Sequence, residues 1–285
     1  MDLAQLFQLG ASGLAVGGVY ALAGLSVALV YRAARLFHLL VGEGLALGGL
    51  AMAVAGAWER GILLALLSGL AVGGVLVLLA RWLRGREVAE VIVAFLGLSL
   101  ALKNAFILLF GPASRPAPSP WPGVWVVGEV AVNRTYLVVL GVVALLVVFT
   151  FYLLERTWIG RRLEAVAEDP VAARVLGLPA SLLQGLALLL AGVLGGMAGA
   201  LLAPLYYASP TLGYLLLLKA VTAAIVGGLL SPLGAVVGGF ALGLAESFGG
   251  FFASAYRDAL VFGLMLLLLV FFPKGVVRER TQTRV

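Results

Sequence analysis

The sequence predicts an all-α polytopic membrane protein with about eight or nine spanning helices in a single domain, residues 1–285. Hydrophobic residues make up 63% of the chain and charged residues 11%, with a mean hydropathy of +1.14. Soluble domains contain about 45–50% apolar and about 25% charged residues. Apolar runs of about twenty residues recur, the length that crosses about 30 Å of hydrocarbon. Charges are confined to short patches between these runs.

The apolar runs place the individual spans. They cover residues 7–30, 37–57, 62–80, 88–110, 135–154, 183–203, 215–231, 235–250 and 259–272. The weakest break is Ser231-Pro232-Leu233-Gly234, which is either a turn between two spans or an interruption within a re-entrant pair. The first run has no basic segment before it, so we read it as a retained span rather than a cleaved signal.

The basic residues predict the orientation, and the net charge of +6 is attributed to this role rather than to nucleic-acid binding. With the N-terminus outside, the cytoplasmic segments collect Arg32, Arg35, Arg81, Arg84, Arg86, Arg156, Arg161, Arg162, Arg174, Lys274, Arg278, Arg280 and Arg284. The outer segments hold only Arg60, Arg115, Arg134 and Arg257. The C-terminus and segment 155–182 are therefore expected in the cytoplasm.

Several kinds of chemistry are excluded by composition. The chain has no cysteine, which rules out disulfides, thiolate metal sites and a cysteine nucleophile, and its only histidine is His38. The motifs H-E-x-x-H, G-x-S-x-G and G-x-x-x-x-G-K-[ST] are absent. We predict a non-catalytic chain with no cofactor or metal, which does not cradle ATP phosphates itself.

Two further patterns concern packing and the longest outer loop. Loop 111–134 is rich in proline, and its alternating apolar positions near the end predict a short hairpin. Glycine pairs four residues apart predict close helix contacts. These pairs are Gly13/Gly17, Gly69/Gly73, Gly192/Gly196, Gly195/Gly199, Gly234/Gly238 and Gly239/Gly243.

The stretch GRRLEAVAEDPVAARVLGLP, residues 160–179, predicts two short helices with a joint. The first covers 161–168; Asp169 is suited to cap the second helix, with Pro170 at its first position and Gly177 at its end. A solvated connector and a docking surface both fit these residues. Segment 155–182 is long for a plain helix–helix link, and small alanines suit a surface that fits a groove on another protein.

Several blocks together resemble permeases of bacterial ABC importers for branched-chain amino acids. GRRLEAVAEDPVAARVLGLPAS is similar to their cytoplasmic coupling segment, and KAVTAAIVGGLLSPLGAVVGGFALGLAES (219–247) to their Lys-Ala-Phe-Thr-Ala-Ala block. FLGLSLALKNAFILLFGP (95–112) and FFPKGV (271–276) are similar to the fourth-span and closing patterns. One departure is HLLVGE (38–43), which retains only Gly42 and Glu43 of Asn-Phe-Ala-His-Gly-Glu.

The resemblance implies an ABC importer permease fold in the bacterial inner membrane and a translocation path for branched-chain or related amino acids. Its expected partners are two ABC ATPase subunits, a second related permease or a second copy, and an extracytoplasmic solute-binding protein. The ATPases would dock on 160–179 and couple ATP hydrolysis to alternating access. The residues expected to carry this coupling are Arg161, Glu164, Ala165, Glu168, Asp169, Arg174 and Gly177.

The sequence gives weaker evidence for the substrate path than for the coupling segment. Ionisable groups within spans are functional candidates because charge is costly in hydrocarbon. The ionisable candidates are considered together with polar or motif residues next to them in the sequence. The full set is Gly42, Glu43, Lys103, Asn104, Lys219, Thr222 and Glu246. Each has a plainer interpretation: Lys219 could snorkel outward, and Lys103 could pair with an acidic side chain on a neighbouring helix.

Two alternatives remain open at this point. Relatives in the same superfamily move sugars, nucleosides or urea-like amides. An ion-coupled secondary transporter would need carboxylates near the middle of the bilayer, for which Glu43 and Glu246 are the available residues.

Overall fold

The computed structural model describes residues 3–35, 40–83, 85–127 and 130–252, with isolated positions 254, 259, 262–263, 266–267 and 270–271. The long elements are α1 (Leu3–Ala34), α2 (Leu40–Val54), α3 (Trp58–Trp82), α4 (Val88–Phe110), α5 (Arg134–Phe151), α8 (Ala180–Tyr206), α9 (Leu212–Gly227) and α10 (Pro232–Phe252). The short ones are strands β1 (Val124–Val127) and β2 (Val130–Asn133), the π-helical turn η1 (Tyr152–Arg156), α6 (Trp158–Glu168) and α7 (Pro170–Val175).

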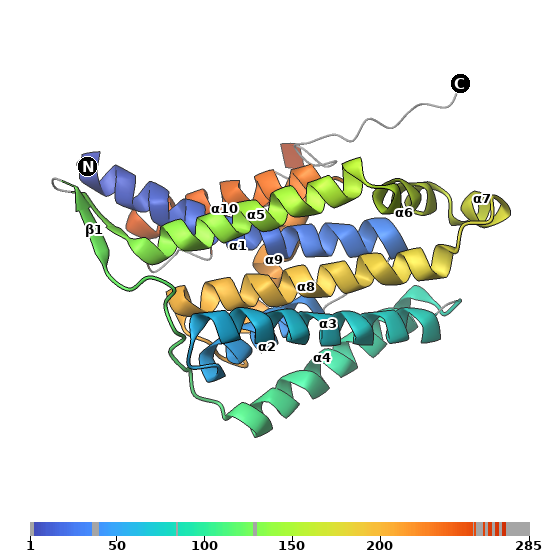
Figure 1. Cartoon of the computed structure of the whole chain (residues 1–285), viewed down its shortest axis with the longest axis horizontal. Coiled ribbons are helices and arrows are strands. Elements are labelled where there is room, and N and C mark those ends of the chain that lie inside the picture. The colour runs from blue at the N-terminus through green and yellow to red at the C-terminus, as the bar shows by residue number, and fades with distance from the viewer. Residues whose placement is uncertain are drawn as a thin grey trace.

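Helices α1 and α8 form the centre of an elongated bundle (Figure 1). Helix α1 packs against α10, α8, α9 and α5, and α8 packs against α3 and α2 as well. Helices α3, α4 and α5 lie at the periphery and expose many large apolar side chains. Such an apolar exterior is the surface that a bilayer covers.

The lengths of the helices bear on the number of spans. Six described helices are long and apolar enough to cross a membrane, at Ala4–Ala34, Trp58–Trp82, Val88–Phe110, Arg134–Arg156, Ala180–Tyr206 and Pro232–Phe252. Helices α2 and α9 are apolar but shorter. Half of the predicted run 259–272 falls outside the described residues, as do His38, Arg84 and the part of FFPKGV after Phe271. The count of eight or nine spans stays a prediction.

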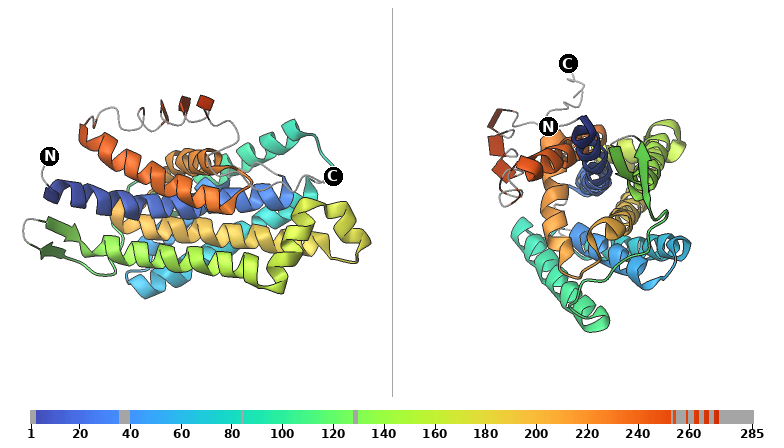
Figure 2. Two further views of the ribbon diagram at one scale, coloured as in Figure 1. Left: turned by 90° about the horizontal axis from the view of Figure 1, so that it is seen from above. Right: turned by 90° about the vertical axis from the view of Figure 1, so that its left-hand side faces the viewer.

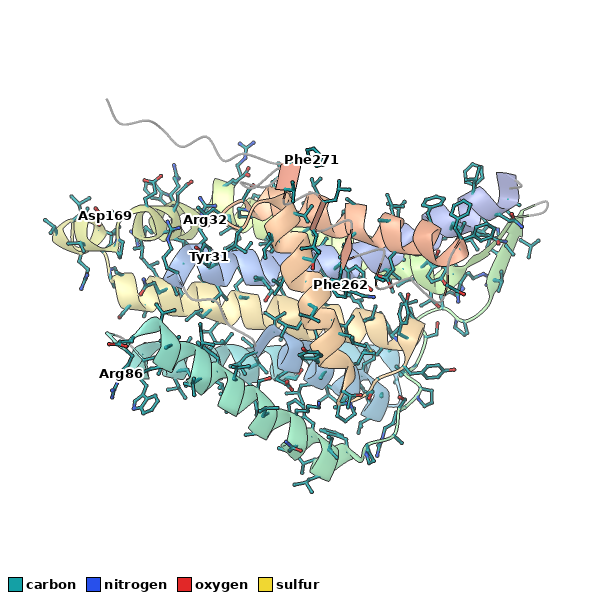
Figure 3. The ribbon with its side chains drawn as sticks, turned by 180° about the vertical axis from the view of Figure 1, so that it is seen from behind. Tyr31, Arg32, Arg86, Asp169, Phe262 and Phe271 are labelled. Carbon is teal, nitrogen blue, oxygen red and sulfur yellow. The ribbon has the colours of Figure 1, made fainter. Side chains whose placement is uncertain are left out.

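Helix α9 differs from the prediction of a spanning helix over 215–231. Figure 3 shows it running across the direction of the other helices, and it contacts α10, α1 and α2. Its 16 residues reach only about 24 Å at 1.5 Å per residue. The chain then turns at Gly228, whose φ is +110°, and the Ser231 hydroxyl accepts a hydrogen bond from the amide of Gly234 (3.1 Å). The break at Ser231-Pro232 is therefore a true turn between two helices.

Glycines set the spacing of the central helices, as the sequence predicts. A Cβ added at Gly69 would lie 2.7 Å from the carbonyl oxygen of Gly192, so α3 and α8 touch backbone to backbone. The same close approach joins Gly17 of α1 to α10, where an added Cβ would be 3.0 Å from the Cα of Phe240. These contacts hold α1, α3, α8 and α10 in one tight core.

The two ends of the bundle carry different structures. At one end, β1 and β2 form an antiparallel hairpin with Val124 opposite Asn133 and Val127 opposite Val130, which confirms the predicted hairpin. At the other end, α6 and α7 project beyond the long helices (Figures 1 and 2). Loop 111–134 and segment 155–182 thus lie at opposite ends of the molecule.

Candidate functional site

Local signals fold the α6–α7 segment as predicted. Thr157 caps α6 by accepting a hydrogen bond from the amide of Gly160 (3.1 Å). Asp169 ends α6 and caps α7, because its Oδ1 accepts from the amides of Val171 (2.8 Å) and Ala172 (2.9 Å). Pro170 begins α7, and Gly177 follows its end with a φ of +79°. Glycine adopts this left-handed conformation without the penalty that a Cβ brings.

One face of this helix pair anchors it to the bundle. Leu163, Val166 and Ala173 are buried in a small apolar cluster with residues at the start of α8. Glu164 was expected among the docking contacts, but its carboxylate meets the Arg32 guanidinium of α1 at 3.1 Å. This exposed pair contributes at most about 1 kcal/mol to stability, yet it joins α6 directly to the central helix.

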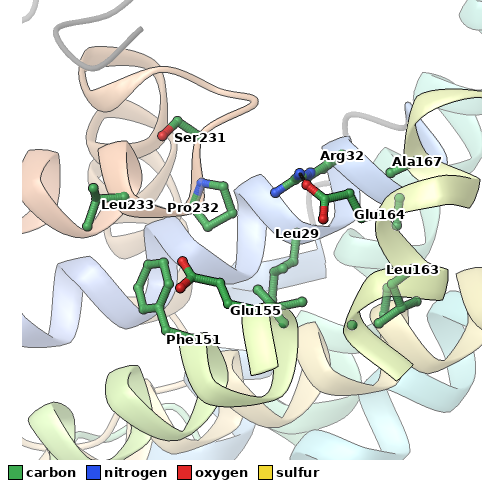
Figure 4. Close-up of a pocket in the computed structure, with 14 residues that line it drawn as sticks. Leu29, Arg32, Phe151, Glu155, Leu163, Glu164, Ala167, Ser231, Pro232 and Leu233 are labelled. Carbon is green, nitrogen blue, oxygen red and sulfur yellow. Dashed lines mark hydrogen bonds and ion pairs between the residues drawn. The ribbon is translucent and has the colours of Figure 1, made fainter. Parts of the chain in front are cut away.

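A cavity of about 260 Å³ lies beside this contact, between α1, η1, α6 and the turn before α10 (Figure 4). Arg32 and Glu164 meet on one side of it, and Ser231 and Pro232 line the side formed by that turn. Glu155 of η1 also lines it. Helix α6 is therefore fixed to α1 but borders open space toward α10, so the segment has room to shift.

The opposite face of the helix pair is exposed and combines charge with apolar side chains. We call this the docking surface: Arg161, Glu168, Val171, Arg174, Val175 and Leu176. The last two are 83% and 79% exposed. Arg161 lies over the Trp158 ring at 4.5 Å, and Arg174 Nε donates to the Pro170 carbonyl (3.0 Å), which fixes both cations in place.

The apolar part of the docking surface was missed by the sequence reasoning, which looked for charge. A signal was available, because Val171 and Val175 are four residues apart and lie on one helical face. The other residues predicted to carry the coupling lie outside the docking surface. Ala165 is half-buried, Gly177 is exposed, and Asp169 uses its carboxylate as a helix cap.

Within the bundle, the structure brings Lys219 of α9 and Glu246 of α10 together. Their side chains are 10% and 2% exposed, and Lys219 Nζ donates to Glu246 Oε1 at 2.7 Å. The ammonium also lies 5.6 Å from the centre of the Tyr20 ring on α1. The interpretation of Lys219 as an outward snorkelling residue is therefore wrong. Nearby in the sequence, the Thr222 hydroxyl donates to the Leu218 carbonyl (2.7 Å).

A second polar contact joins α2 to α4. The Ser99 hydroxyl donates to Glu43 Oε1 (2.8 Å), while Glu43 Oε2 is buried and accepts no hydrogen bond from the described residues. Lys103 lies four residues after Ser99 on α4, on the same side of that helix. Asn104 instead points away from the core and donates to its own helix at the Leu100 carbonyl (2.7 Å).

Helix α9 packs directly against α2 at their first turns. A Cβ added at Gly42 would lie 2.7 Å from the Gly213 carbonyl oxygen. Apart from Asn104, the predicted path residues form two groups, one around Lys219 and Glu246 and one around Glu43. Among the described residues, no group of three or more His, Cys, Asp or Glu is placed to hold a metal ion.

Comparison with known proteins decides the family. Residues 10–269 match the family model of the branched-chain amino acid transport system permease component. The chain belongs to this permease family. It is 34% identical over 204 residues to the high-affinity branched-chain amino acid transport system permease protein BraD of Pseudomonas aeruginosa. It is 32% identical over 193 residues to LivH of Escherichia coli K12.

The aligned region of the permease covers 69% of this chain and 66% of BraD, and 65% of this chain and 63% of LivH. It thus spans a little under two thirds of these relatives. The fold is also similar to a solved structure, PsaBC from Streptococcus pneumoniae in complex with Fab. That comparison has a TM-score of 0.50 at 16% identity and covers 96% of this chain and 94% of the other.

Proposed function

We propose that this chain is the transmembrane permease subunit of an ATP-driven importer for branched-chain amino acids, located in the bacterial inner membrane. The single observation that carries this proposal is the family match, which extends over residues 10–269. The proposed partners are two ABC ATPases, a second permease or a second copy of this one, and an extracytoplasmic solute-binding protein.

The docking surface is the proposed site of the ATPases. It stands at one end of the bundle, and its exposed valine and leucine side chains are the kind of surface that a partner protein covers. The distribution of arginines supports a cytoplasmic position for this end, with the N-terminus and the hairpin outside. Eight or nine spans, with the C-terminus in the cytoplasm, complete the proposed topology.

Coupling would act through the anchored face of the same segment. An ATPase that binds one position of α6–α7 more tightly than another shifts the equilibrium between the two states of the permease. The Arg32–Glu164 contact and the apolar cluster on α8 would carry that shift to α1 and α8. Both helices lie at the centre of the bundle, so a movement there alters the packing around the proposed path.

The test is uptake of labelled leucine into proteoliposomes that hold the permease, its ATPases and its binding protein. We expect uptake to require ATP and to fall at least tenfold when both exposed charges are reversed, in Glu168→Lys with Arg174→Glu. A matched control is Glu59→Lys, an exposed residue at the opposite end of the bundle. Uptake that needs a proton or sodium gradient but no ATP would overturn the proposal in favour of a secondary transporter.

Competition identifies the solute in the same assay. Unlabelled valine and isoleucine are expected to compete with leucine, while sugars, nucleosides and urea are not. Competition by one of those three classes alone would assign the permease to another substrate of the same superfamily.

A further inference from the structure

A basic cavity lies at the end of the bundle that carries α6 and α7, on the side away from them. It has a volume of about 480 Å³ and is bordered by the last turns of α1 and α3 and the first turns of α4 and α8. Arg35, Arg81 and Arg86 line it, and no Asp or Glu is among its described lining residues. Figure 3 shows Tyr31 and Arg86 at this same end of the molecule.

The cavity also offers neutral hydrogen-bonding groups. The hydroxyl-bearing residues Tyr31 and Ser181 line it together with the arginines, and Arg35 lies 6.0 Å from the centre of the Tyr31 ring. Guanidinium groups bind phosphate through pairs of parallel hydrogen bonds. Three arginines lining one cavity together with two hydroxyl groups form a site suited to a phosphate-bearing anion.

A second hollow adjoins the first and is mainly apolar. Its volume is about 520 Å³, and its lining includes Trp82, Ala89 and Val93 together with Leu83 and Arg86, which also line the basic cavity. Trp82 and Val93 are 70% and 67% exposed on the outside of the bundle. The one acid on this lining, Glu90, pairs with Arg86 at 3.5 Å, so the two hollows together keep an excess of positive charge.

The level of these hollows relative to the bilayer follows from the helices. They lie where α3 ends at Trp82 and α4 begins at Val88, and both helices are long enough to span. Tryptophan and arginine at the end of a span are typical of the membrane–water interface. A basic cavity at this level, continuous with an apolar groove facing outward, matches a phospholipid with its headgroup in the first and an acyl chain in the second.

We propose that Arg35, Arg81 and Arg86 form a binding site for an anionic phospholipid, whose acyl chain lies in the adjoining apolar hollow beside Trp82 and the first turns of α4. The arginines would bind the phosphate group of the lipid, and a soluble anion could also supply a phosphate group. The apolar groove favours the lipid, because a free phosphate leaves that groove unused. If this end faces the cytoplasm, the lipid belongs to the inner leaflet.

The experiment measures lipid bound to the purified permease after delipidation, with phosphatidylglycerol as the probe and phosphatidylcholine as the neutral comparison. We expect selective retention of phosphatidylglycerol. Each of Arg81→Gln and Arg86→Gln should lower its affinity about fivefold, and the double variant about 25-fold. Arg81→Lys with Arg86→Lys keeps the charges but loses the paired hydrogen bonds, so it should bind the lipid more weakly than the unaltered protein and more tightly than the double glutamine variant.

The matched control is Arg60→Gln, which removes an exposed arginine at the other end of the same helix α3 and should leave retention unchanged. Inorganic phosphate at millimolar concentration distinguishes the two sources and is expected not to displace the lipid. Equal retention by the double glutamine variant and the unaltered protein would overturn the proposal. Full displacement by inorganic phosphate would overturn the lipid in favour of a soluble anion.

Discussion

At the scale of single residues, Lys219 and Glu246 are two charged residues in separate apolar segments of the sequence that form one buried ion pair in the structure. Each is unusual in an apolar helix and was singled out for that reason. They are 27 positions apart and lie on different helices, so their 2.7 Å contact depends on α9 crossing the bundle. A charge buried without its partner costs several kcal/mol, whereas a paired one costs much less.

We therefore expect Lys219→Met to lower the free energy of unfolding by about 3–5 kcal/mol, because Glu246 is left buried without its ammonium partner. The double variant Lys219→Met with Glu246→Leu should recover most of that loss. Denaturant unfolding in detergent micelles measures both. Asn104→Leu, at an exposed position of α4, serves as the neutral control. Equal instability of the single and double variants would contradict the pairing argument.

Single glycines set the distance between helices, so a methyl group added at one of them lowers the stability of the folded protein. A Cβ at Gly69 would be 2.7 Å from both the Gly192 carbonyl oxygen and the Val193 Cα, which are backbone atoms and cannot rotate away. Gly69→Ala is expected to destabilise the protein by about 1–3 kcal/mol, measured as a lower melting temperature. Gly74→Ala on the same helix meets no atom within 4 Å and should be neutral or slightly stabilising.

At the scale of the elements, α6 and α7 depend on the cap that joins them. Asp169→Ala removes the acceptor for two amides and should cost about 1 kcal/mol of local stability. Asn caps helices about as well as Asp, so Asp169→Asn keeps the structure while removing the charge. Hydrogen exchange of the α7 amides measures how much the cap stabilises α7. ATPase activity of the assembled transporter measures coupling, which we expect to fall in the alanine variant and to survive in the asparagine variant.

If coupling fails in Asp169→Asn while the α7 amides stay protected, the negative charge itself acts in docking. In that case the assignment of Asp169 as a purely structural cap would be wrong.

Elements whose structure depends on residues close together in the chain could be predicted from the sequence. Elements whose structure depends on residues far apart in the chain could not. The α6–α7 joint, the hairpin in loop 111–134 and the four-residue spacing of the contacting glycines follow from residues close together in the chain, although the helices that the glycines meet are distant in it. The crosswise course of α9 does not, because its uniformly apolar residues read like any spanning segment until the packing of α10, α1 and α2 is known. For the same reason, the contact of Glu164 with Arg32, 132 residues away, could not be predicted from the sequence. Its docking role stays a prediction, because the Glu164 side chain is 53% exposed.

At the scale of the whole molecule, the proposed function depends on the separation of two ends by one tightly packed core. The hairpin stands at one end and the docking surface at the other, with α1 and α8 between them. Because α6 contacts α1 through Arg32 and packs on the first turns of α8, force applied at the docking surface reaches the centre of the bundle directly. The chain belongs to the branched-chain amino acid permease family, and we propose that this arrangement serves transport.

The measurement that tests the central claim most directly is protection of a single cysteine on α7. The chain has no cysteine of its own, so Val175→Cys introduces the only thiol, at a side-chain position that is 83% exposed. A maleimide that cannot cross membranes should label it rapidly in inside-out vesicles of the permease alone and at least tenfold more slowly once the ATPases are bound. Val126→Cys on the hairpin is the control: it should be labelled only from the outer face, in right-side-out vesicles, and equally with and without co-expressed ATPases. Equal labelling of Val175→Cys with and without the ATPases, or labelling only from the outer face, would contradict the account.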